Sequence, residues 1–188
     1  ILIGLVGSEM CIRDRDTEDP LKVAVLMNAH ALNSAQNIVC SGIQDALEQE
    51  KLQGSEIQMS LITVDDTNTF SVEESIRDIF MDQTLPDIII CLNELSTTCV
   101  YQAVVDYNCV GEIAILGYYD TDTILKAIER NVITATISID TEQMGAFCVD
   151  ALQEYYNYGY TSQYFTADVT VIDQSNVEEY LGKQEEAE

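Results

Sequence analysis

Polar and aromatic side chains follow several apolar runs of this 188-residue sequence at the point where each run ends. Asn93 and Glu94 follow one nearly continuous apolar run, and Tyr118, Tyr119 and Asp120 follow the next. Amides and carboxylates exchange hydrogen bonds with hydroxyl groups, and aromatic faces pack on the apolar faces of rings. These residue types therefore predict a binding site for a small polar molecule such as a sugar.

Further candidates stand after the other apolar runs of the sequence. They are Asn28, His30, Asp66, Ser138 and Asp140. In an open parallel sheet, ligands bind outside the carboxyl ends of the strands, where loops meet helix N-termini. For Asn and Asp residues, the alternative interpretation is a turn or a helix cap, because the backbone alone favours short polar side chains there.

The elements that must position these residues alternate from residue 22 onward, since short apolar runs alternate with segments of helical period. The expected strands are 22–27, 57–64, 87–92, 112–116 and 133–137, and the expected helices are 32–50, 72–81, 95–107 and 123–130. The almost wholly apolar run 87–92 is typical of a central parallel strand covered on both faces. The pattern predicts an α/β fold, a Rossmann-like three-layer α/β/α arrangement around a mostly parallel sheet.

The simple repeat stops after residue 140. A long helix is expected at 141–157, a strand at 164–172 and a short helix at 176–181. Residues 182–188 are rich in glutamate, which predicts a solvated, disordered tail.

The order and spacing of several motifs resemble the type 1 periplasmic-binding-protein superfamily, which includes sugar-binding lipoproteins and the effector domains of lactose-repressor-like regulators. The motifs are KVAVLMN at 22–28, SGIQDAL at 41–47, LPDIII at 85–90, NE at 93–94, GYYD at 117–120, ITATI at 133–137 and MG at 144–145. The resemblance implies one lobe of a two-lobed fold. Residues 16–140 would form the C-terminal lobe, and 141–181 would cross back toward the first lobe. Because 188 residues are too few for two typical lobes, we expect a fragment.

The sequence also departs from the superfamily's pattern. The arginine that usually precedes the glycine of the first helix is missing before Gly42. Tyr119 stands where the resemblance implies a ligand-binding Asp, and Ile139 stands where a hinge glutamine is usual. Asn93 matches the pattern cleanly. These departures predict a ligand other than a familiar pentose or hexose held in the usual way, with a more apolar or amine-bearing molecule as an alternative.

Two functions follow from the resemblance. The first is an extracellular or periplasmic solute-binding protein, in which two lobes close on a sugar-like ligand for uptake by an ABC-transporter permease or for a sensor. In this interpretation the full-length protein is either free or attached to the membrane by a lipid anchor. The alternative is the effector-binding domain of a cytoplasmic lactose-repressor-like regulator. The acidity and the tyrosine-rich region 155–160 favour the first function.

Charge and motifs exclude other classes. The formal net charge of −25 would repel the phosphate backbone of nucleic acids and anionic membranes, and no apolar run is long enough to cross a membrane. The turn after the first strand has no glycine, and neither a phosphate-binding loop nor a Gly-x-Ser-x-Gly motif occurs.

Asp65 and Asp66 are conceivable as the acidic pocket of a phospho-receiver domain. That fold also needs acidic residues after its first strand and a lysine after its last, and neither is found. We therefore expect a binding protein without enzymatic activity, cofactor or metal.

The first fifteen residues, ILIGLVGSEMCIRDR, resemble a translated sequencing-adapter artefact. A lipoprotein signal would need a basic segment ahead of its apolar run, which is absent here. We interpret residues 1–15 as this artefact or as a disordered leader, and we expect the protein to extend upstream.

The cysteines beyond residue 15 stand in apolar contexts and are expected to be small buried hydrophobes, with a single disulfide as an alternative. They are Cys40, Cys91, Cys99, Cys109 and Cys148.

Overall fold

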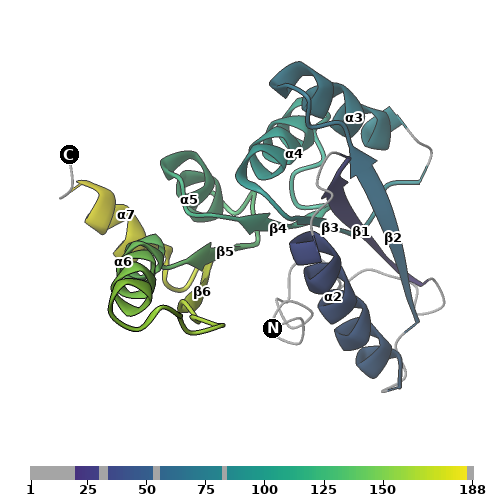
Figure 1. Cartoon of the computed structure of the whole chain (residues 1–188). Coiled ribbons are helices and arrows are strands. Elements are labelled where there is room, and N and C mark those ends of the chain that lie inside the picture. Colours follow the sequence, from purple (N-terminus) through teal and green to yellow (C-terminus); the bar gives the residue numbers. More distant parts are fainter. Residues whose placement is uncertain (1–19, 30–33, 53–55, 82–83, 186–188) are drawn as a thin grey trace.

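The computed structural model describes residues 20–29, 34–52, 56–81 and 84–185 (Figure 1). The strands are β1 (Leu21–Asn28), β2 (Ile57–Val64), β3 (Ile88–Cys91), β4 (Ala114–Tyr118), β5 (Ala135–Ile139) and β6 (Val169–Asp173). The helices are α2 (Ser34–Leu52), α3 (Thr69–Met81), α4 (Glu94–Asp106), α5 (Asp122–Glu129), α6 (Thr141–Tyr158) and α7 (Val177–Glu185). The interpreted leader 1–15, His30 and residues 186–188 of the predicted tail lie outside the described residues.

The strands form one sheet in the order β2-β1-β3-β4-β5-β6. The first five strands are parallel, and β6 runs antiparallel to β5. The carboxyl ends of the parallel strands therefore share one edge of the sheet. Between β1 and β3 the direction of strand addition reverses, which is where open sheets of this kind bind ligands. The arrangement confirms the predicted α/β fold with a mostly parallel sheet.

Helices cover both faces of the sheet, and alternate residues of each strand point to opposite faces. Val23 and Val25 of β1 pack in one core with Leu47 of α2. Ala24 and Leu26 pack in the other core, beneath α3, α4 and α5. Figure 1 shows α2 on one side of the sheet and these three helices on the other. The sheet is thus the middle of three layers.

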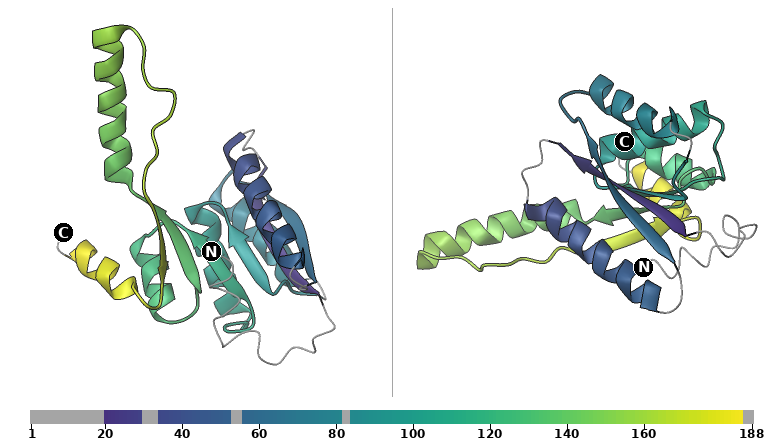
Figure 2. Two further views of the ribbon diagram at one scale, coloured as in Figure 1. Left: turned by 90° about the horizontal axis from the view of Figure 1, so that it is seen from below. Right: turned by 90° about the vertical axis from the view of Figure 1, so that its right-hand side faces the viewer.

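The segment after β5 leaves these layers. Helix α6 projects away from the sheet, and residues 159–168 run back beside it to β6 (Figure 2). We call residues 141–168 the arm. Phe147 and Phe165 meet within it, with ring centroids 5.4 Å apart. The Glu154 carboxylate accepts a hydrogen bond of 2.7 Å from the backbone N–H of Ser162. No residue of α6 is buried, so its outer face packs on nothing within the described part of the chain.

Several expectations need correction. Residues 182–185, expected to belong to a disordered tail, are helical, because α7 packs beside α5 and continues to Glu185. The strands expected at 112–116 and 133–137 each begin and end two residues later, because their ends are set by pairing with neighbouring strands. The strand expected from residue 164 begins at Val169, since β5 ends at Ile139 and offers earlier residues no partner. Cys148 is exposed on α6, whereas Cys40, Cys91, Cys99 and Cys109 are buried, and all five thiols are free.

Burial dominates the chemistry of the inner thiols. It raises the pKa of Cys91 to about 12, and the neighbouring Thr97 side chain partly opposes this rise. Burial likewise raises the pKa of Cys99. These two side chains therefore behave as small hydrophobes. Among the described helices, none combines the length and apolarity needed to span a membrane.

Candidate functional site

Asn28 and Asn93 meet at the carboxyl edge, where the direction of strand addition reverses. Asn28 ends β1, and Asn93 follows β3 as the N-cap of α4. The Asn93 side-chain amide donates a 2.6 Å hydrogen bond to Oδ1 of Asn28, while its own Oδ1 accepts from the backbone N–H of Ser96 at 2.7 Å. Asn93 therefore acts as a helix cap. Its amide nitrogen carries a second hydrogen that a ligand could accept.

The next strand supplies a turn formed by Tyr118, Tyr119 and Asp120, all half-buried. Tyr118 ends β4, and Tyr119 adopts a left-handed backbone conformation with φ of 82°. The Asp120 carboxylate accepts a 2.8 Å hydrogen bond from Oγ of Ser138 in β5. The structure thus brings Asp120 and Ser138 together, as their positions after neighbouring strands predict.

The remaining candidates are more dispersed. Glu94 is exposed in the first turn of α4, where its charge complements the helix N-terminus. Asp66 is half-buried in the loop between β2 and α3. Asp140 is the N-cap of α6, and its side chain accepts from the backbone N–H of Gln143 at 2.8 Å. Asp140 is therefore used as a helix cap at the base of the arm.

The structure adds residues at this edge that the sequence patterns do not reveal. Thr97 and Thr136 are completely buried, and their hydroxyls contact the backbone of the turn. Gln36 of α2 accepts a 3.2 Å hydrogen bond from the backbone N–H of Asn28. A threonine within a helix or strand carries no local sign of such a role. Only the spatial neighbourhood of the turn identifies it.

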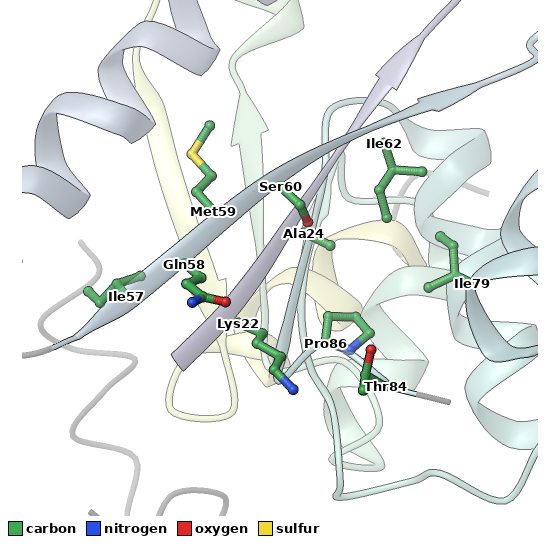
Figure 3. A pocket seen from close by; sticks show the side chains of 10 residues that line it. All are labelled: Lys22, Ala24, Ile57, Gln58, Met59, Ser60, Ile62, Ile79, Thr84 and Pro86. Atoms are coloured by element: carbon green, nitrogen blue, oxygen red, sulfur yellow. The ribbon is translucent and has the colours of Figure 1, made fainter. Parts of the chain in front are cut away.

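Two hollows lie away from this edge. One of about 620 Å³ opens near the amino ends of β1 and β2, where Lys22 and Pro86 contribute to its lining (Figure 3). Its polar side chains Gln58 and Thr84 are exposed. A groove of about 560 Å³ runs between α3 and α4. Neither hollow contains the amide pair or the Tyr118–Asp120 turn. In the described part of the chain, no three His, Cys, Asp or Glu side chains are grouped to hold a metal ion.

The carboxyl edge therefore offers a defined chemistry. Asn93 has an amide donor, Asp120 and Glu94 have carboxylate acceptors, and two tyrosines supply aromatic surface. Such a set suits a neutral molecule with several hydroxyl groups. The topological switch point of an open α/β sheet is where folds of this class bind small molecules.

Comparison with solved structures defines the fold more closely. GanP, a glucose–galactose binding protein from Geobacillus stearothermophilus, matches with a TM-score of 0.72 and 18% identity, over 84% of this chain and 54% of that protein. An ABC-transporter periplasmic solute-binding protein from Actinobacillus succinogenes with bound D-allose matches with a TM-score of 0.70 and 14% identity, over 86% of this chain and 56% of that protein. An ABC-transporter solute-binding protein from Bacillus halodurans with bound myo-inositol matches with a TM-score of 0.69 and 16% identity, over 86% of this chain and 54% of that protein.

These likenesses show that the chain has the fold of one lobe of a type 1 periplasmic-binding protein, as its motifs predict. The chain spans about half the length of the structures that it matches. No protein-family profile matches the sequence. A comparison with curated protein sequences also gives no match.

Proposed function

We propose that this chain is a lobe of an exported sugar-binding protein, which holds a small polyhydroxylated ligand between two lobes for an ABC-transporter permease or a sensor. The observation that carries the proposal is the pairing of Asn28 with Asn93 beside the Tyr118–Asp120 turn. The similar structures support it, because they are named as binding proteins for sugars or as solute-binding proteins of ABC transporters. A periplasmic or extracellular location belongs to the same proposal.

Each side chain of the edge has a role in this proposal. The second amide hydrogen of Asn93 donates to a ligand hydroxyl, and Asp120 and Glu94 accept from others. Tyr118 or Tyr119 packs on the ligand's apolar face. Ser138 holds Asp120 in place, and Asn28 holds Asn93. Asp66 and Asp140 are peripheral in this proposal, and they contact larger ligands.

The arm supports a second lobe as part of the proposal. Met144, Cys148, Leu152 and Tyr156 recur every four residues, so they share one side of α6. All four are exposed, Leu152 by 70% and Tyr156 by 91%. An apolar stripe of this kind usually marks a surface that another part of a protein covers. We infer that the arm packs on the other lobe and crosses the hinge between the two.

Titration of the isotope-labelled chain with D-glucose, D-galactose, D-allose and myo-inositol, followed by NMR, tests the function. We expect a weak interaction that shifts the amides of Asn93 and Tyr118–Asp120, since one lobe supplies only half of the contacts. Asn93→Asp keeps a cap acceptor but loses the amide donor, so it should weaken binding about 2- to 10-fold. Asn108→Asp adds the same charge at an exposed turn and is the matched control.

Two results would contradict the proposal. If none of the four compounds shifts any amide, the edge does not bind sugars. If the shifts fall on the groove between α3 and α4, the binding site lies elsewhere on the lobe.

A further inference from the structure

Two threonine hydroxyls are buried directly behind the candidate binding edge. Thr97 in α4 and Thr136 in β5 each have a relative exposure of 0%. A buried hydroxyl is costly unless it is hydrogen-bonded, so its partners indicate what it does for the fold. Both hydroxyls bond to the backbone of the Tyr118–Asp120 turn rather than to their own element alone.

Thr97 joins the two halves of the edge. Its Oγ1 donates to the backbone carbonyl of Asn93 at 2.8 Å and accepts from the backbone N–H of Tyr118 at 3.0 Å. One hydroxyl therefore fixes the distance between the cap of α4 and the end of β4. Thr97 thereby fixes the backbone of Asn93 relative to the backbone of Tyr118, and so it sets the relative positions of the Asn93 amide and the Tyr118 ring.

Thr136 holds the residue with the unusual backbone. Its Oγ1 donates to the carbonyl of Tyr119 at 2.6 Å, and the N–H of Tyr119 donates to the carbonyl of Ile137 at 2.8 Å. Both backbone polar groups of Tyr119 are thus tied to β5. Among the described non-glycine residues with positive φ, the others are Asn108 and Asn131, a type that tolerates this conformation. A tyrosine persists there only where its surroundings fix it.

Gly117 shows how closely the two threonines approach the turn. A Cβ atom at this position would lie 2.7 Å from Cγ2 of Thr97 and 3.1 Å from Oγ1 of Thr136. Gly117 is the cross-strand partner of Thr136 in the β4–β5 pairing. The absence of a side chain at 117 lets both hydroxyls reach the backbone of the next two residues.

We propose that Thr97 and Thr136 are positioning residues of the binding edge. Their hydroxyls hold Tyr118, Tyr119 and Asp120 in one conformation beside Asn93 before any ligand arrives. The proposal rests on the proposed function for the meaning of this edge as a sugar site. A preorganised edge binds more tightly than a mobile one, because less conformational entropy is lost on binding. It also fixes the face that Tyr119 presents, and so restricts which ligands fit.

Amide hydrogen exchange in the full chain tests the positioning role without a ligand. The variants are Thr97→Val and Thr136→Val, which keep the shape and remove the hydroxyl, and Thr97→Ser and Thr136→Ser, which retain it. Thr134→Val is the matched control, because Oγ1 of Thr134 accepts from the backbone N–H of Ile115 at 3.3 Å near the other end of β5. Exchange at Ile89 in the core reports any global loss of stability.

We expect Thr97→Val to speed exchange at Tyr118 about tenfold beyond the change at Ile89, and Thr136→Val to do the same at Tyr119. The serine variants should restore protection, and Thr134→Val should leave the turn unchanged. In the sugar titration, both valine variants should weaken binding of whichever of the four compounds shifts the wild-type edge. Equal exchange in wild-type and valine variants, an equal effect of Thr134→Val, or no rescue by serine would overturn the positioning role. If no sugar shifts the spectrum of the wild-type chain, the proposed sugar binding is contradicted. The positioning role is then decided by the hydrogen-exchange result alone.

Discussion

At Asn93, the observed helix cap and the proposed ligand-binding group can be the same side chain. Its Oδ1 caps α4 through Ser96, and its amide nitrogen contacts Asn28. The two ends of the side chain thus have separate tasks. A cap fixes the side chain in one rotamer, which is what a binding group needs in order to recognise a hydroxyl. The sequence left both interpretations open, and the structure makes them compatible.

Gly117 gives a prediction at the same scale. Gly117→Ala should destabilise the lobe by about 1–3 kcal/mol, because its Cβ would overlap Thr97 and crowd Thr136. Gly42→Ala is the control, since a Cβ there meets nothing within 4 Å and α2 is helical. The control should stabilise by about 0.5–1 kcal/mol. Chemical denaturation measures both, and a neutral Gly117→Ala variant would contradict the close packing.

Single residues also mark the limit of prediction from this sequence. Asn93 and Asp120 could be placed at the edge, because each directly follows an apolar run. Thr97 and Thr136 could not, because their role depends on contacts between α4, β4 and β5 that lie far apart in the sequence. The left-handed backbone of Tyr119 was equally hidden, since tyrosine gives no local signal for it.

At the scale of elements, periodicity predicted strands and helices well wherever a buried face exists. Ile57–Val64 was predicted at its observed bounds, because alternating apolar residues and flanking polar segments limit it on both sides. The strands that became β4 and β5 were displaced by two residues. Their apolar runs begin in the preceding loop, where Ile113 and Ile133 are buried without belonging to a strand. Burial and strand pairing are therefore separate signals.

The return segment of the arm should respond to pH. The backbone N–H and hydroxyl of Ser162 lower the pKa of Glu154 below its ordinary value of 4.5. A carboxyl whose pKa is lowered on folding stabilises the fold above its unfolded-chain pKa, and that contribution is lost as pH falls through the lowered value. We therefore expect Ser162 to detach from α6 in acid. Its amide shift, followed by NMR against pH, should show this transition.

Glu154→Gln should abolish the acid transition of Ser162, because it keeps an acceptor without a titrating charge. Glu142→Gln removes a charge from the exposed first turn of the same helix and should leave the transition in place. If Ser162 responds identically in wild-type and Glu154→Gln chains, another group controls the segment.

At the scale of the whole molecule, the described chain combines a three-layered lobe with an arm that contributes no buried residue to the lobe's cores. Its structural relatives are nearly twice as long as the part it matches. The strand–helix repeat of the sequence stops at residue 140, where the arm begins. All of 141–181 was expected to form one crossing segment, whereas β6 pairs with β5 and Val177 of α7 lies in the core of this lobe. The sequence could not predict that α6 would project from the sheet, since periodicity indicates an apolar face without saying what covers it.

Removal of the arm should leave the lobe folded. Ile139 and Val169 are partners in the antiparallel β5–β6 pair, and the N–H of Asp140 donates to the carbonyl of Asp168 at 3.0 Å. A variant that joins Asp140 to Asp168 by an Asn-Gly turn should form a hairpin at this point. We expect a similar free energy of unfolding and weaker binding of a hydrophobic dye. A lobe that no longer unfolds cooperatively would show that the arm supports it.

The antiparallel β5–β6 pair determines how the arm can change during evolution. The arm leaves and re-enters the sheet through adjacent strands, so it is an insertion at a single turn. The entropy of closing such an insertion grows only slowly with its length. The arm can therefore lengthen, shorten or change its surface while β1, β3 and β4 keep the binding edge unchanged. Under the proposed function, recognition of the ligand and contact with the other lobe are therefore encoded in separable parts of the chain, and each can evolve without the other.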